Sequence, residues 1–169
     1  VELSRVQMAG VNLRNVYLTG AQLADVEMSS SDLRETRLDG SNLSRANLSE
    51  SYLRGASLKG ATLSEANLRG AILTKALFLD ANLRGADLAD ANLSGADLSR
   101  ADLTGANLKG AKLNGANLTS AILDEADISL ANINKANLSG VIAGGTNFSG
   151  ANLAGAILVG AKLNGAVLG

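Results

Sequence analysis

The segment GANLKGAK, residues 105–112, has the glycine spacing of a loop that would hold a phosphate group. In such a loop a lysine follows the second glycine directly, and a serine or threonine follows the lysine. Here Lys112 stands one place late and Leu113 occupies the hydroxyl position. Because glycine recurs on a five-residue period along the chain, this spacing arises from the repeat itself, and we assign no phosphate site to it.

Acid–base, nucleophilic and metal chemistry have equally little support in the sequence. The chain contains no His and no Cys, so it has no side chain that titrates near neutrality, no thiol nucleophile and no disulfide. Asp87, Asp97 and Asp102 fall on three different sides of the fold deduced below, so they cannot converge on one calcium ion. We therefore expect no enzyme activity, no cofactor, no metal and no small-molecule substrate.

The composition predicts one domain over residues 1–169. Hydrophobic residues make up 46% of the chain and charged residues 18%, which is enough apolar material for a substantial core. Aromatic residues reach only 2%, so Ala and Leu must fill the interior. The net charge of -1 argues against a nucleic-acid partner.

A strict five-residue period runs through the whole sequence. Positions 1, 6, 11 and onward hold Ala, Val, Ser or Thr in all 34 repeats, and two residues later Leu, Ile, Met or Phe occurs in 33 of 34. The residue between them is usually polar, most often Asn or Asp, and the fifth position is Gly in 17 of 33 cases. A sequence with such self-similarity is typical of a repeat architecture.

Five residues fit neither a helix nor a continuous strand. In an α-helix, leucines five residues apart would be spread around the whole surface, and in a straight strand successive leucines would face opposite sides. The chain must therefore bend once per repeat, with the small residue and the Leu pointing inward and the polar residue between them pointing out. Gly, Asn, Asp and Ser at the corner suit turn conformations, so we expect a solenoid of stacked corners.

Units such as Ala86–Asp90 (ADLAD) and Ala106–Gly110 (ANLKG) resemble those of the pentapeptide-repeat family, and the resemblance covers the whole chain. It implies an all-β, right-handed quadrilateral β-helix with four pentapeptides per coil, here about eight and a half coils without internal loops. The charges support a coil of four repeats. Arg5, Asp25 and Arg45, followed by Glu65, would alternate in one column, and opposite charges favour that register.

Residues that depart from the repeat are candidates for function. Ala143 replaces an inward Leu, and we favour a local void filled by Phe148 on the next side over a ligand notch. Leu77 and Leu79 should face outward and be exposed.

Apolar residues also gather near the carboxyl end. Ile157, Val159 and Val167 form a candidate self-association patch, because the last coil of a solenoid presents unpaired strand edges. End-to-end pairing of two copies through these coils is the form of dimer that we expect, and the resemblance implies the same.

Charge is distributed unevenly over the four sides. We number the sides by the repeats that begin at residues 1, 6, 11 and 16 of each coil; their net charges are -2, -3, +4 and 0. Side three carries a strip made of Arg14, Arg34, Arg54, Lys75, Lys112 and Lys135. With Asp32 and Glu35 interleaved, the strip is either a solvated ladder, the more common case, or a docking surface for an acidic protein.

Two functions follow. The first is a non-catalytic scaffold whose sides and ends bind a protein partner. The second, implied by one branch of the similar family, is a DNA mimic that modulates a type II topoisomerase and protects gyrase. B-DNA carries a charge about every 1.7 Å, so a mimic of about 40 Å would need on the order of 20 net negative charges. Sides one and two together reach only -5, which favours the scaffold.

The longest apolar runs, such as Ala76–Leu79, are far too short to span a bilayer, so we expect no membrane insertion. We expect the protein in the cytoplasm. The chain begins at Val1, inside the repeat and without Met, so the periplasm and the thylakoid lumen are the alternatives if a targeting segment has been removed.

Overall fold

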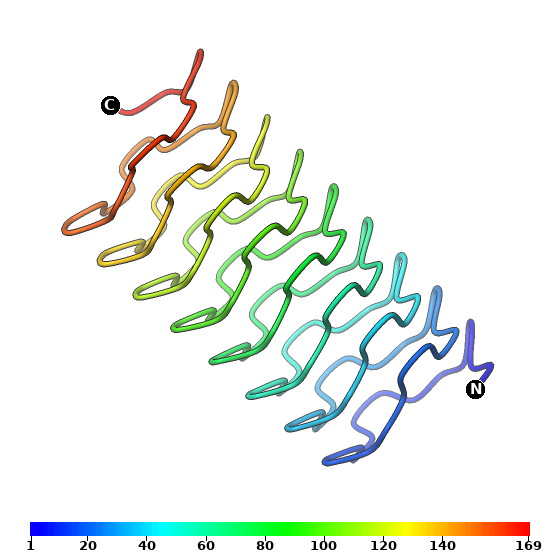
Figure 1. Ribbon diagram of the computed structural model, residues 1–169. Coiled ribbons are helices and arrows are strands. Elements are labelled where there is room, and N and C mark those ends of the chain that lie inside the picture. Colours follow the sequence, from blue (N-terminus) through cyan, green and yellow to red (C-terminus); the bar gives the residue numbers. More distant parts are fainter.

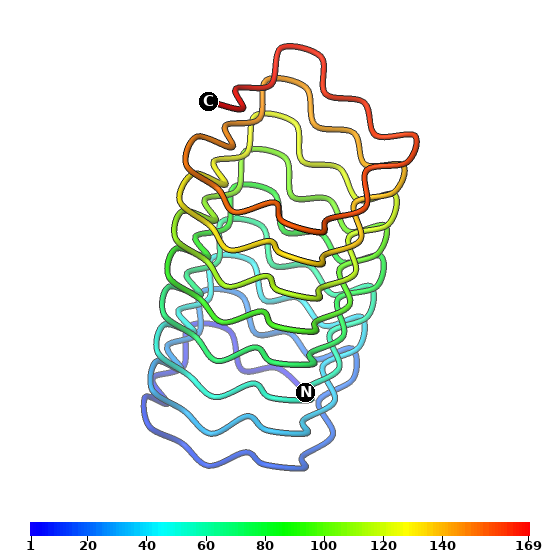
Figure 2. The same cartoon turned by 90° about the vertical axis from the view of Figure 1, so that its left-hand side faces the viewer.

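The computed structural model describes all residues from 1 to 169 and forms a rod of stacked square coils, with the two termini at opposite ends (Figures 1 and 2). Thirty parallel bridges, each one residue long, join residue n to residue n+20, from Glu2↔Gln22 to Asn147↔Val167. No residue is helical, and no strand is longer than one bridge. The prediction of a coil with four repeats, and so of about eight and a half coils, is confirmed.

Each repeat consists of one bridge and one tight turn. In the repeat that begins at Ala86, the amide of Asp87 donates to Ala66 O at 2.9 Å and the amide of Leu88 donates to Asn107 O at 2.7 Å. The repeat then ends in a turn at Ala89 and Asp90, which is closed by the amide of Ala91 donating to Leu88 O at 3.1 Å. The bonds of Asp87 and Leu88 tie each coil to the coil on either side of it.

The fifth residue of every repeat has a positive φ. This applies to 17 glycines and to 16 other residues, among them Asp90 at 59°. Since the fourth residue is never in this region, the turn has the geometry of type II, which requires a positive φ at its third residue. The turn therefore recurs without interruption, and no loop projects from the rod.

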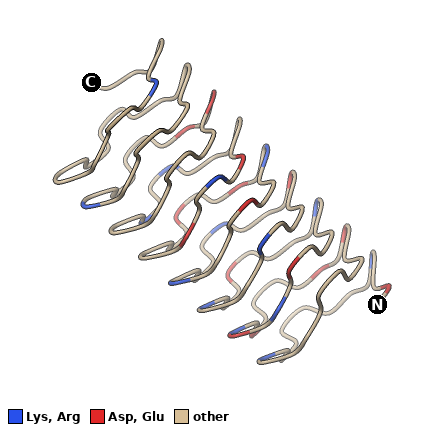
Figure 3. Cartoon of the chain, in the orientation of Figure 1, with Lys and Arg blue, Asp and Glu red and all other residues tan.

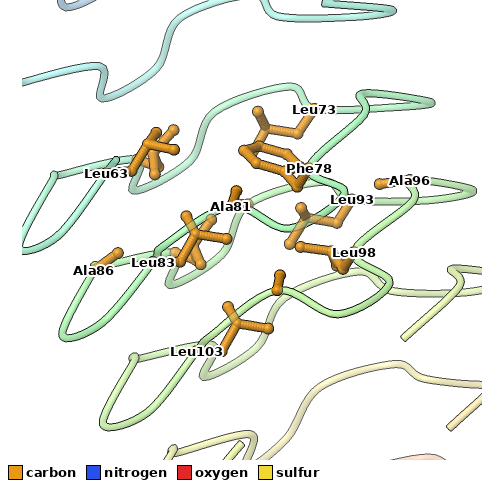
Figure 4. Packing of buried hydrophobic residues seen from close by; sticks show 14 of the residues in the cluster. Leu63, Leu73, Phe78, Ala81, Leu83, Ala86, Leu93, Ala96, Leu98 and Leu103 are labelled. Atoms are coloured by element: carbon orange, nitrogen blue, oxygen red, sulfur yellow. The ribbon is translucent and has the colours of Figure 1, made fainter. Parts of the chain in front are cut away.

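The interior is a continuous stack of Leu and Ala side chains. A cluster of 48 buried hydrophobic residues fills the bore, and Leu93, Leu98 and Leu103 are among those shown in Figure 4. Leu88, Leu93, Leu98 and Leu103 are all 0% exposed. A Leu on each of the four sides thus meets the others on the axis, as the repeat predicts. Burial of this aliphatic surface is the main source of stability.

A few inward positions carry hydroxyl groups, and these are satisfied by the backbone. Thr36 Oγ1 donates to Leu13 O at 2.8 Å, Ser41 Oγ to Leu38 O at 2.7 Å, and Thr146 Oγ1 to Leu123 O at 2.6 Å. A buried hydroxyl without a partner would destabilise the fold, so these bonds let Ser and Thr replace Ala.

The predicted column of alternating charges lies along one edge of the rod, where the first coils alternate between blue and red (Figure 3). Arg45 Nε lies 2.7 Å from Asp25 Oδ1, and the second nitrogen lies 2.8 Å from Asp25 Oδ2. This bidentate ion pair joins the corners of two adjacent coils. Separately, no helix in the structure has the length and apolar character needed to cross a membrane.

Candidate functional site

The three arginines of side three stack at the fourth position of successive coils, but their environments differ. Arg34 donates two hydrogen bonds to Asp32, from Nε to Oδ1 at 2.8 Å and from Nη2 to Oδ2 at 2.5 Å. The hydrogen bonds from Arg34 lower the pKa of Asp32 to about 2. Arg14 and Arg54 form no ion pair and are exposed, so two of the three guanidinium groups are free for a partner.

The lysines of side three lie in other columns of the same side. Lys75 and Lys135 occupy corner positions, with φ of 58° and 56°. Lys112 occupies the second position and forms bridges to Asn92 and Asn132. All three lysines are exposed and without an ion pair. The strip is thus a broad, mostly unpaired basic band rather than one ladder.

A groove of about 430 Å³ lies where side three turns into side four, in the first four coils. Gly55 and Ser57 of the third coil line it, and both have smaller side chains than Glu35 and Arg37, which occupy the same positions one coil earlier. Tyr17, Arg37 and Lys59 also line it. It is the one groove on the surface, and the repeat pattern does not predict it.

Two interactions shape the groove. The Arg37 guanidinium lies over the Tyr17 ring, 5.1 Å from the ring centroid, in a cation–π contact. Asp39 Oδ1, which also lines the groove, accepts hydrogen bonds from the Ser57 hydroxyl and, at 3.1 Å, from the Lys59 amide. These contacts restrict the side chains of Arg37 and Asp39.

The carboxylate of Glu35 overlies Gly55 at the rim. A Cβ atom at Gly55 would lie 2.5 Å from Glu35 Oε1, so a larger residue there would displace the flexible end of the Glu35 side chain. Gly55 has a φ of +69°, which glycine also adopts without strain. Gly55 thus leaves room for the Glu35 carboxylate in a groove that Arg37 and Lys59 also line.

The prediction that Leu77 and Leu79 are exposed is wrong. Both face outward, but each is only partly exposed, and neither belongs to the large exposed hydrophobic residues. Leu77 forms bridges to Ser57 and Asp97, and adjacent coils shield it on both sides. It contributes an apolar patch to the groove.

The structure places Ala143 and Phe148 inside the core. Ala143 is 0% exposed and Phe148 is 1% exposed, on adjacent sides of one coil. The only groove of the molecule lies elsewhere, in the first four coils. The interpretation that Phe148 fills the space left by Ala143 fits this arrangement and stays a prediction.

At the carboxyl end, Ile157 is 48% exposed, Val159 74% and Val167 50%. Leu158 and Leu168, at inward positions, are also exposed, because no further coil stacks on them. The repeat pattern predicts both leucines as core residues. The last coils are also poor in charge, with no acidic residue after Asp127 (Figure 3).

Comparison with known proteins identifies the repeat. The family model described as pentapeptide repeats, with 8 copies, matches residues 2–40, 41–78, 63–100, 101–140 and 131–169. The chain belongs to the pentapeptide-repeat family. Like its solved relatives, this pentapeptide-repeat protein is a right-handed quadrilateral β-helix.

Two solved structures illustrate the relationship. HetL of the cyanobacterium Nostoc sp. strain PCC 7120, a pentapeptide-repeat protein involved in heterocyst differentiation regulation, is 33% identical; the match covers 99% of this chain and 86% of HetL, with a TM-score of 0.60. QnrB1, a plasmid-mediated fluoroquinolone resistance protein, is 18% identical over 95% of this chain and 84% of QnrB1, with a TM-score of 0.61. The likeness to QnrB1 concerns the fold alone. No curated protein sequence matches the chain significantly.

Side-chain contacts between coils of this pentapeptide-repeat protein go beyond what the five-residue pattern alone predicts. Tyr17 and Arg37 are one coil apart, the separation that already placed Asp25 under Arg45. The same rule, applied to aromatic residues, would have found the pair. To predict the groove, one must also compare the sizes of the side chains that stack 20 residues apart in each column.

Proposed function

We propose that this pentapeptide-repeat protein is a non-catalytic scaffold that binds an acidic surface of a partner protein through side three. The observation that supports the proposal most is the state of the basic strip. Five of its six cations form no ion pair, and only Arg34 is neutralised by a neighbouring carboxylate. Cations without intramolecular partners favour association with a surface of opposite charge.

The regular geometry supports the same proposal. The strip lies on a rod whose walls repeat with every coil and whose interior is packed with aliphatic side chains. A solenoid of this type offers an extended surface rather than an enclosed site. HetL, which is 33% identical to this chain, is involved in the regulation of heterocyst differentiation. An extended surface of this kind is consistent with a regulatory protein that acts by binding another protein.

Affinity capture tests the proposal. We would immobilise the protein, pass an extract of its native organism over it, and identify the retained proteins. The test variant is Arg14→Gln, Arg54→Gln and Lys75→Gln; the matched control is Arg5→Gln, Arg69→Gln and Lys109→Gln on sides one and two. We expect a protein retained by the parent and the control to be lost from the test variant. Equal retention by both variants would contradict docking on side three.

The second candidate, DNA mimicry toward a type II topoisomerase, has weaker support. The two acidic sides total only -5, and the acids Asp25, Asp102 and others are engaged by arginines of the same chain. We expect no effect on DNA supercoiling by gyrase in the presence of a quinolone. Protection at near-stoichiometric protein would establish the second candidate and reject the scaffold.

A further inference from the structure

We propose that the corner between sides three and four, in the first four coils, binds an acidic segment of a partner protein, with the groove beside Tyr17 and Arg37 as its centre. This inference rests on the proposed function and narrows it. It places the strongest binding at Arg37 and Lys59, which lie outside the strip on side three. It also predicts that Lys112 and Lys135 contribute little.

The pairing of arginines supports this choice of site. Five of the nine arginines hold a carboxylate of the same chain, namely Arg34, Arg45, Arg69, Arg84 and Arg100. The other four are Arg5, Arg14, Arg37 and Arg54, and the last three lie at this corner. Arg5 is the one unpaired arginine elsewhere on the rod, so the arginines without a carboxylate partner are concentrated at this corner.

The net charge of the corner favours an acidic occupant. Over the first four coils, sides three and four contain six cations and four carboxylates, 6 - 4 = +2; the cations are Arg14, Arg34, Arg37, Arg54, Lys59 and Lys75, and the acids are Asp32, Glu35, Asp39 and Asp80. In Figure 3 the corner residues of the first four coils appear in blue at the lower left, with red on the second coil. Charge complementarity of this kind determines partner choice and association rate more than affinity.

The aromatic residues point to the same corner. The chain has only two tyrosines, and Tyr17 and Tyr52 lie on sides four and three, 71% and 47% exposed. Tyr and Arg are enriched among the residues that contribute most to protein–protein binding, because each combines a broad apolar surface with polar atoms. The contact with Tyr17 also restricts Arg37, which reduces the entropy lost when a carboxylate binds.

The carboxylates in the groove favour a protein segment over a nucleic acid. Glu35 lies on the rim above Gly55, and Asp39 is fixed by Ser57 and the Lys59 amide. A phosphate backbone, which carries charge at every nucleotide, would meet both acids. An acidic peptide can place Glu or Asp against Arg37 and Lys59 and a neutral residue opposite Glu35.

Tyrosine fluorescence allows a direct test, because the chain contains no Trp. In a Tyr52→Phe variant, Tyr17 is the only tyrosine. The probe is an acetylated ten-residue peptide of six glutamates and four glycines. We expect the peptide to change the Tyr17 emission in a saturable way at low salt. We expect Arg37→Gln with Lys59→Gln to weaken binding at least tenfold.

The matched control removes two cations from side three instead, as Lys112→Gln with Lys135→Gln, and should weaken binding less than twofold. All four substituted residues are exposed, and thermal unfolding would verify the fold of both variants. Equal weakening by the two pairs would overturn the inference, and so would binding of a ten-residue oligothymidylate as tight as that of the peptide.

The test separates this inference from the proposed function. If only the Lys112 and Lys135 pair weakens binding, an acidic partner still docks on side three, and the corner inference alone is wrong. If the peptide does not change the Tyr17 emission of the Tyr52→Phe variant, and the parent captures no protein through side three, both are wrong.

Discussion

Arg100 binds Asp80 of the preceding coil with two hydrogen bonds, Nε–Oδ1 at 2.7 Å and Nη2–Oδ2 at 2.7 Å. Both residues occupy corners with positive φ, and the adjacent corners of the same column are Gly60 and Ser120. The pair is therefore isolated from other charges in its column. It offers a clean test of how much an ion pair between coils adds to stability.

We expect Asp80→Arg to lower the unfolding temperature slightly, because it places two guanidinium groups face to face. The double variant with Arg100→Asp restores an opposite-charge pair and should return the temperature close to that of the parent. Exposed ion pairs contribute little, so the differences will be small. Thermal unfolding followed by circular dichroism measures them, and failure of the double variant to recover would contradict a pairwise interaction.

A central leucine should matter far more than a charge pair. Leu88 is completely buried, so Leu88→Ala should lower the free energy of unfolding by about 2–5 kcal/mol. Leu163 in the last coil is only partly buried, and Leu163→Ala should cost less than half as much. Urea unfolding of the two variants tests this, and equal losses would contradict a core that is tighter in the middle of the rod.

The irregular core position at Ala143 predicts a compensating pair. If Phe148 occupies the space that an inward Leu would fill, Ala143→Leu alone overpacks the core and should destabilise it by about 1–3 kcal/mol. Ala143→Leu with Phe148→Leu should recover most of that loss. Urea unfolding of the single and double variants measures the coupling. Additive effects would mean that the two side chains do not share the space.

Acid should destabilise the fold through its ion-paired carboxylates. Hydrogen bonds from Arg34 lower the pKa of Asp32 from 3.8 to about 2. Because the folded-state pKa is the lower one, this interaction stabilises the fold above about pH 4 and is lost as the pH falls toward 2. Hydrogen bonds from Arg45 and Arg100 lower the pKa of Asp25 and Asp80 in the same direction.

We expect the urea midpoint to fall between pH 4 and pH 2, and to fall less in Asp32→Asn, which has already lost the pair. The matched control is Asp124→Asn, an acid without an ion pair. An identical acid response in the parent and in Asp32→Asn would show that the pair with Arg34 does not stabilise the fold.

Self-association through the carboxyl-terminal coils is the remaining prediction. Ile157 and Val167 are half-exposed, and covering them by a second copy would bury apolar surface. Ile157→Glu with Val167→Glu should leave the fold intact and turn a dimer into a monomer. Light scattering measures the mass of both proteins. A monomeric parent would refute the prediction.

The five-residue period was sufficient to predict the fold, because the same positions of every repeat face the interior and the same positions face the solvent. It placed Leu88 inside and Asp87 outside, and both placements are confirmed. It did not predict what the outward Asp and Asn do. Asp87 Oδ1 accepts the Ala89 amide at 3.0 Å and the Asn107 side-chain amide at 2.9 Å, so the residue holds both its own turn and the next coil.

The corners show where residue preference alone misleads. Gly, Asn, Asp and Ser were expected there, yet Glu, Arg, Lys and even Leu130 adopt positive φ, Leu130 at 60°. Such a conformation costs a non-glycine residue about 1–2 kcal/mol. The backbone bonds to neighbouring coils, such as Leu130 N to Ser149 O at 2.9 Å, impose it. The candidate groove escaped prediction for a similar reason, because it depends on neighbours that lie a full coil apart in the sequence.

The bridges between residues n and n+20 also limit how such a rod can change its length. Duplication or loss of one whole coil would leave every remaining side chain facing the same way. Loss of a single pentapeptide would shift every later residue to the neighbouring side of the rod. A binding surface that runs along one side would then be split between two sides. Growth by complete turns is thus the one change of length that keeps such a surface whole.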